Sequence, residues 1–150
     1  MNIRFLVGVS GMVLLVSLPA VAADNLQLNN HLDYQSDSAD GPLITGDNMS
    51  AGIVAGEPNY IIIYAEECFN SKRQARRTVE LYSKYKSRMN FVVVDLDQPR
   101  SAAQEDLIRK YYQGSIPQVT VLDRAGHAVY DRAGEVETQF VTTVLDKTLR

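Results

Sequence analysis

The residue with the clearest chemical potential in this 150-residue sequence is its one cysteine, Cys68. It follows a run of apolar residues at 60–64 and precedes a segment with helical spacing, so it falls at the start of a helix. Unpaired backbone N–H groups at a helix start, together with the positive end of the helix dipole, stabilise a thiolate. The position therefore predicts a nucleophilic, partly exposed thiol.

Charged neighbours act on this thiol in opposite directions. Lys72 and Arg73 bring positive charge to the first turns of the helix, whereas Glu66 and Glu67 bring negative charge just before it. The alternative to a reactive thiol is an inert buried cysteine, because free cysteine packs well as a small hydrophobic residue. The location of Cys68 at a helix start favours the reactive thiol.

The N-terminal pattern predicts export. Arg4 supplies a short positive region, residues 5–18 an apolar stretch and residues 20–22 a small-residue cleavage site, so residues 1–23 are typical of a signal peptide. The expected location is periplasmic or secreted. A single thiol makes no disulfide within the chain, so a free Cys68 in an oxidising compartment needs an explanation.

Charge and composition exclude several classes of partner. The chain has 15 Lys and Arg against 18 Asp and Glu, a net charge of −3, which argues against nucleic acid and against an electrostatic membrane anchor. His31 and His127 lie far apart in sequence, and with one cysteine they make no convincing metal site. There is no glycine-rich phosphate loop, so we expect no metal and no cofactor.

The elements that must position the thiol follow from hydrophobic spacing. Residues 60–64 and 91–96 are apolar without alternation, as in strands buried on both faces, and the segment between them has helical spacing. A shorter helix, a hairpin and a terminal helix follow. The order βαβαββα predicts an α/β domain over residues 48–150, with a mixed central sheet and helices on both faces.

Residues 24–47 contrast with this domain. They are polar and contain little apolar material, so the sequence predicts a flexible or loosely packed leader between the signal peptide and the domain.

Several segments resemble thioredoxin-like proteins. Residues 64–72, Tyr-Ala-Glu-Glu-Cys-Phe-Asn-Ser-Lys, are similar to the active-site segment of that superfamily, in which an aromatic-Ala-acid stretch leads into Cys-x-x-Cys and then a lysine. Ile116-Pro117 matches the family's Ile-Pro, whose proline is cis and packs beside the active cysteine. Residues 97–98 and Gly134 also fall where members commonly have them. The resemblance covers residues 50–149 and implies a thioredoxin-like fold.

The departures from that pattern define what chemistry remains. Ser71 replaces the second cysteine, giving Cys-x-x-Ser, and Ile62 and Val93 occupy positions where members carry a buried acid and a lysine. The chain has no tryptophan. A dithiol reductase attacks a disulfide with its first cysteine and releases itself with the second, so Cys68 can perform only the first half.

The resemblance implies a monothiol site. Cys68 and Ser71 are its catalytic candidates, with the Ser71 hydroxyl either donating a hydrogen bond to the thiolate or facing solvent. Ile116 and Pro117 are the substrate-binding candidates, placed to pair with an extended segment of a bound polypeptide by strand addition.

Three hypotheses follow from these residues. In the first, Cys68 forms mixed disulfides with protein clients or small thiols, and an external thiol then releases Cys68. Such a protein acts in thiol–disulfide exchange, isomerisation or reduction. In the second, the protein is a redox-inactive adaptor whose groove binds partners without a covalent bond. In the third, Cys68 links two copies of the chain.

Overall fold

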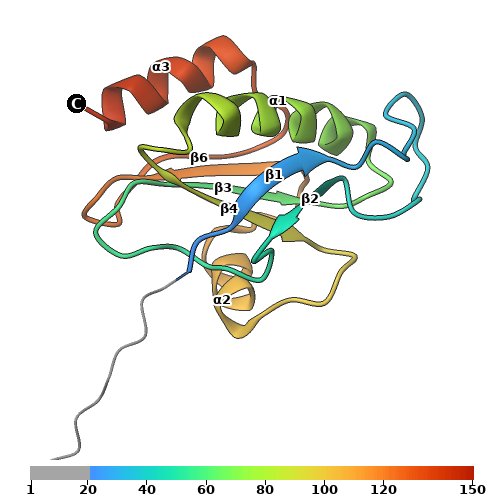
Figure 1. The fold of residues 1–150 in the computed structure, drawn as a ribbon, viewed down its shortest axis with the longest axis horizontal. Helices are drawn as coiled ribbons and strands as arrows, with labels where there is room; N and C mark the ends of the chain where they lie inside the picture. Colours follow the sequence, from blue (N-terminus) through green and yellow to red (C-terminus); the bar gives the residue numbers. More distant parts are fainter. Residues whose placement is uncertain (1–20) are drawn as a thin grey trace, which may run out of the picture.

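The computed structural model describes residues 21–150, so nearly all of the expected signal peptide lies outside the described residues. A four-stranded sheet with the order β4-β3-β5-β6 forms the centre of the molecule (Figure 1). β3 (Asn59–Tyr64) pairs in parallel with β4 (Asn90–Asp95) and antiparallel with β5 (Gln118–Leu122), which forms a hairpin with β6 (Ala128–Ala133). Within residues 21–150 no helix is long and apolar enough to cross a bilayer.

Three helices cover the two faces of this sheet. α1 (Phe69–Tyr85) and α3 (Thr138–Thr148) lie on one face and α2 (Ala102–Tyr111) on the other, as Figure 1 shows. Every residue of β3, β4 and β5 is buried, which explains why β3 and β4 carry no alternating polar pattern. The predicted order βαβαββα, with a mixed sheet and helices on both faces, is confirmed for residues 59–148.

Successive residues of β3 serve two separate cores because side chains alternate across a strand. Tyr60, Ile62 and Tyr64 pack in the core that contains α1 and α3. Ile61 and Ile63 pack in the core under α2. The strand is thereby held from both sides, and its C-terminal end is a rigid base for the loop that leads to Cys68.

The expectation of a loosely packed leader is wrong. β1 (Asp24–Leu28) and β2 (Ile44–Asp47) form a two-stranded antiparallel sheet that packs against α1 (Figure 1). Leu26, Leu43 and Ile44 are buried and belong to the larger core. The apolar residues of this segment are few, but these three face inward together, so a polar average over the segment conceals a packed face.

Polar contacts also attach the segment to the domain. The Tyr82 hydroxyl of α1 donates to the carboxylate of Asp24, and the backbone N–H of Asn25 donates to the same hydroxyl oxygen at 2.9 Å. The bond from Tyr82 holds the pKa of Asp24 below its ordinary value. The backbone N–H of Ile44 donates to the Tyr64 hydroxyl at 3.3 Å. Residues 24–47 are therefore an integral layer of the fold.

This packing predicts a large effect of truncation in the N-terminal segment. Replacing the fully buried Leu43 by alanine removes core contacts and leaves a cavity, so we expect a loss of about 2–4 kcal/mol of unfolding free energy. Urea denaturation of residues 24–150 measures it, with Gln27→Ala, an exposed position of β1 in the same segment, as the control. A loss below about 0.5 kcal/mol for Leu43→Ala would indicate a detached leader.

Candidate functional site

Cys68 is the N-cap residue of α1 and is partly exposed. Its backbone is extended, with φ −83° and ψ 119°, and its side chain makes no capping hydrogen bond. The thiol lies in an open cleft of about 660 Å³. The cleft is lined by Asp37, Ala65, Glu67, Cys68, Phe69, Asn70 and Ile116. The predicted thiol thus lies at a helix start and is open to a ligand.

A carboxylate from the N-terminal segment caps α1 beside the thiol. The backbone N–H of Phe69, the first residue of the helix, donates to Asp37 Oδ1 at 2.9 Å. The first turn of α1 contains no acidic residue of its own. Asp37 therefore takes one of the helix-terminal donors that the sequence alone assigned to the thiolate.

Lys72 holds this capping loop in place. Its ammonium donates to the backbone oxygens of Asp33 and Ser36, both at 2.6 Å, and to the Ser38 hydroxyl at 3.0 Å. Because Asp37 lies between two of the residues that Lys72 binds, this contact keeps the Asp37 carboxylate near Cys68.

Lys72, expected to bring positive charge to the thiol, is directed instead into the N-terminal loop. The side chain is only 1% exposed. A buried ammonium needs several hydrogen-bond acceptors, and the loop formed by residues 33–38 supplies three.

Arg73, the other expected cation, is also engaged. Its Nε and Nη2 atoms donate to Glu135 Oε2, and Nη2 also donates to Asn70 Oδ1 at 2.8 Å. The bonds from Glu135 raise the pKa of Arg73. The guanidinium also stacks over the Phe69 ring, 4.5 Å from its centroid. The positive charge of Arg73 is thus shared with a carboxylate and is not reserved for the thiol.

Ser71 matches neither of its two expected roles. The side chain is fully buried, so it does not face solvent, and its hydroxyl oxygen has no hydrogen-bond partner among the described residues, Cys68 included. A buried hydroxyl without a partner costs about 1–3 kcal/mol relative to its hydrated state. The structure therefore places Ser71 beneath the helix start, where it packs rather than binds.

The two substrate-binding candidates lie at different depths. The Ile116–Pro117 peptide bond is cis, and Ile116 lines the cleft together with Cys68. Pro117 is buried, and its carbonyl accepts from the Gly134 N–H at 2.7 Å. Within residues 21–150 no backbone hydrogen bond involves Ile116. Its peptide groups are therefore available to a bound chain, whereas Pro117 supports the loop from below.

Two acidic residues near the thiol are tied into the loops around it. The carboxylate of buried Glu66 accepts from Gln98 Nε2 at 2.6 Å, and the Glu66 N–H donates to Asp97 Oδ2 at 2.8 Å. These bonds join the loop before Cys68 to the end of β4. Residues 97–98, which the resemblance singled out, therefore brace the cysteine loop.

The described part of the chain contains no cluster of metal-ligating side chains. Among residues 21–150 no three His, Cys, Asp or Glu side chains are close enough to hold a metal ion. His31 and His127 are both exposed, and they lie on different parts of the chain, in the loop after β1 and in the β5–β6 turn.

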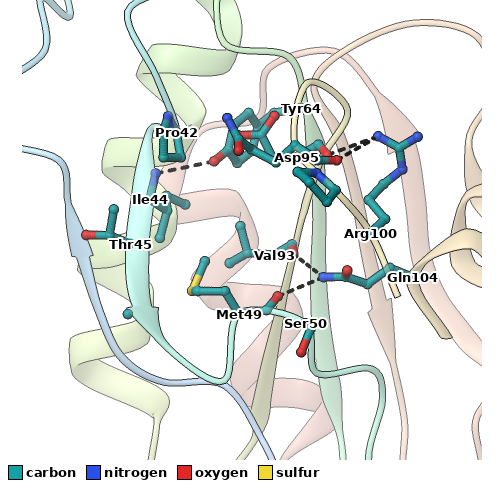
Figure 2. A pocket seen from close by; sticks show the side chains of 13 residues that line it. Pro42, Ile44, Thr45, Met49, Ser50, Tyr64, Val93, Asp95, Arg100 and Gln104 are labelled. Carbon is teal, nitrogen blue, oxygen red and sulfur yellow. Dashed lines mark hydrogen bonds between the residues drawn. The ribbon is translucent and has the colours of Figure 1, made fainter. Parts of the chain in front are cut away.

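A second cavity, of about 400 Å³, lies between β2, the ends of β3 and β4, and α2 (Figure 2). Gln104 spans it, with Nε2 donating to the backbone oxygens of Met49 at 2.8 Å and Val93 at 2.9 Å. Asp95 is 8% exposed, and its Oδ2 has no hydrogen-bond partner among the described residues. Burial raises the pKa of Asp95 to about 6.

The raised pKa of Asp95 predicts a pH-dependent stability. The folded protein binds this proton more tightly than the unfolded chain, in which an aspartate has its ordinary pKa of 3.8. The contribution of Asp95 to stability therefore falls as pH rises from about 4 to about 6. Asp95→Asn removes the buried charge. We expect it to raise the unfolding free energy at pH 7–8 by roughly 1–2 kcal/mol, after allowance for solvent screening.

Denaturation of wild type and Asp95→Asn at pH 4, 5, 6, 7 and 8 checks this. The gain should shrink towards pH 4, and Asp106→Asn, an exposed carboxylate on α2, should show none of it. An Asp95→Asn protein that is less stable than wild type at pH 8 would contradict the assignment.

Comparison with known proteins gives a structural match without a sequence match. No protein-family model matches the chain, and no curated protein is significantly similar to it. Among solved structures, thioredoxin-2, a component of the malaria parasite protein secretion machinery, is 20% identical, with a TM-score of 0.53 over 65% of this chain and 87% of that one.

A second solved structure agrees. A protein from Chlorobium tepidum assigned as the thiol:disulfide interchange protein DsbE is 15% identical, with a TM-score of 0.53 over 72% of this chain and 88% of that one. The element order, the mixed sheet and the helix arrangement described above are those of these structures. The chain therefore has the thioredoxin fold.

Proposed function

We propose that this chain is an exported monothiol protein that forms mixed disulfides with polypeptide clients through Cys68. One observation carries the proposal: Cys68 is the partly exposed N-cap residue of α1 and shares an open cleft with Ile116, whose peptide groups make no backbone hydrogen bond within residues 21–150. The nucleophile Cys68 and the backbone of Ile116, which has no hydrogen-bonded partner strand, thus line the same cleft.

The chemistry is a thiol–disulfide exchange without net oxidation. The Cys68 thiolate attacks one sulfur of a client disulfide, the Cys68–client S–S bond forms, and the second client sulfur leaves as a thiolate that takes up a proton. Ser71 supplies no second thiol. Release therefore requires another thiol, either the client's own cysteine, which gives isomerisation, or an external small thiol, which regenerates Cys68 and leaves the client in a new disulfide.

Client binding would use the backbone around Ile116. An extended segment that pairs with these peptide groups gains hydrogen bonds that do not depend on sequence, as in strand addition. Phe69 and Ala65, which also line the cleft, add apolar surface for the side chains next to the client disulfide.

The proposed compartment is the periplasm or the exterior of the cell, on the pattern of residues 1–23. Client disulfides persist in such compartments, whereas the cytosol keeps thiols reduced. The location therefore supplies the substrates that a monothiol exchange needs.

One observation favours a second function, a redox-inactive adaptor that uses the same cleft without covalent chemistry. Asp37 occupies the Phe69 N–H and places a carboxylate in the cleft that contains Cys68, so the helix start has one donor fewer for a thiolate. The two functions differ in the rate at which Cys68 reacts, which is measurable directly.

Covalent capture separates them. Incubation of residues 24–150 with the neutral 2-hydroxyethyl disulfide at pH 7 should give one mercaptoethanol adduct per chain, located at Cys68 by peptide mass spectrometry, at a rate about tenfold above that of free cysteine. Ser71→Ala should form the same adduct, and Cys68→Ser none. A rate below that of free cysteine would favour the adaptor, and a disulfide-linked dimer in place of the adduct would favour a covalent homodimer.

The role of Asp37 gives a second prediction. Asp37→Asn removes the charge but keeps an oxygen that can accept the Phe69 N–H. The thiolate form of Cys68 is then favoured, and its alkylation by the neutral reagent iodoacetamide at pH 7 should accelerate by about twofold to fivefold. Asp106→Asn on α2 serves as a control for net charge. An unchanged or slower rate for Asp37→Asn would show that the carboxylate does not act on the thiol.

A further inference from the structure

We propose that the Cys68 cleft selects disulfides that carry positive charge next to the reacting sulfur. The inference rests on the proposed function, since it concerns which substrates that thiol takes. Its basis is the distribution of charge around the cleft, where the carboxylates face the substrate and each nearby cation is engaged elsewhere.

Two carboxylates border the sulfur from different segments of the chain. Asp37 belongs to the N-terminal loop and is held at the start of α1 by its bond to the Phe69 N–H, and Glu67 directly precedes Cys68. Both side chains are exposed and both line the cleft. Neither makes an ion pair among the described residues, so their charges remain available to a ligand.

No cation balances them at the cleft surface. The seven residues that line it include no lysine, arginine or histidine. Lys72 is buried, and its donors bind two loop carbonyls and a hydroxyl. Arg73 binds Glu135. The Lys72 charge is thus directed into the N-terminal loop. The Arg73 guanidinium, which lies over the Phe69 ring, shares its charge with Glu135, so the two cleft carboxylates outnumber the cations near the cleft.

The rest of the lining is apolar or neutral. Ala65, Phe69 and Ile116 provide apolar surface, and Asn70 is uncharged. A cysteine flanked by lysine, arginine or a free amine, with apolar residues beyond, fits this combination. A disulfide flanked by carboxylates meets repulsion from both Asp37 and Glu67.

The expected size of this selection follows from exposed charges in water. Two carboxylates lie within one Debye length of the reacting sulfur. Each raises the rate of encounter with a cationic substrate by a few-fold, and salt screens the effect. We therefore expect a threefold to tenfold preference for a cationic over an anionic disulfide at low ionic strength, roughly halved or less at 0.5 M salt.

The test uses three small disulfides of similar length: cystamine, which is a dication, the neutral 2-hydroxyethyl disulfide, and the dianion 3,3′-dithiodipropionate. In each reaction the Cys68 thiolate attacks one sulfur, the protein–probe disulfide forms, and half of the probe leaves as a thiolate. The rate with each probe is divided by the rate of 2-mercaptoethanol with the same probe, which removes the intrinsic reactivity of the probe.

Three proteins are compared: wild type, Asp37→Asn/Glu67→Gln, and Glu80→Gln/Asp106→Asn, whose two exposed carboxylates on α1 and α2 lie outside the cleft. A change in the thiolate fraction alters all three probe rates equally and cancels in the cystamine to dithiodipropionate ratio. We expect a ratio of three to ten for wild type and the control pair, falling to about one for the cleft pair.

Each outcome has a distinct meaning. Equal normalised rates for all three probes with wild type would overturn the inference while leaving the exchange reaction intact. The inference would also fail if the Asp37→Asn/Glu67→Gln variant kept the wild-type ratio of cystamine to dithiodipropionate rates. Failure of wild-type Cys68 to react with any probe would instead overturn the proposed function. Circular dichroism confirms that the variants are folded.

Discussion

The arrangement around the thiol depends on one buried ammonium. Lys72 donates to two backbone oxygens and a hydroxyl of the loop at residues 33–38, which gives a buried charge its acceptors and gives a polar loop a single conformation. The loop lies over the start of α1, where Asp37 caps the helix. The N-terminal segment, the helix and the cysteine are therefore joined by direct contacts into one structural unit.

This unit creates opposed influences on Cys68. The helix start and its dipole place positive potential at Cys68, whereas Asp37 and Glu67 place negative charge in the same cleft and repel anions. Ser71 and Pro117 are buried beneath the site and leave Cys68 and Ile116 as the groups that meet a ligand. In the proposed function, the reactivity of Cys68 and its choice of substrate both depend on carboxylates outside the cysteine motif.

The sequence predicts those parts of the fold that rest on local patterns. The buried strands without alternation and the helical spacing of residues 69–85 predict the domain. The Ile-Pro before β5, through its family resemblance, predicts that Ile116 and Cys68 lie close together, as they do in the cleft. The packed segment at residues 24–47, the buried Lys72 and the cap by Asp37 escaped prediction. Each depends on contacts between residues more than 30 positions apart, and polar residues carry no periodic signal of such contacts.

The central claim is that Cys68 meets disulfide clients where the protein acts. Rapid acidification of the cells that make it, followed by alkylation of free thiols, purification and peptide mass spectrometry, measures this directly, because acid stops thiol–disulfide exchange. The account predicts that a fraction of Cys68 is linked to cysteine peptides of other proteins, with lysine or arginine enriched beside the linked cysteine. Recovery of Cys68 only as the free, alkylated thiol would contradict it.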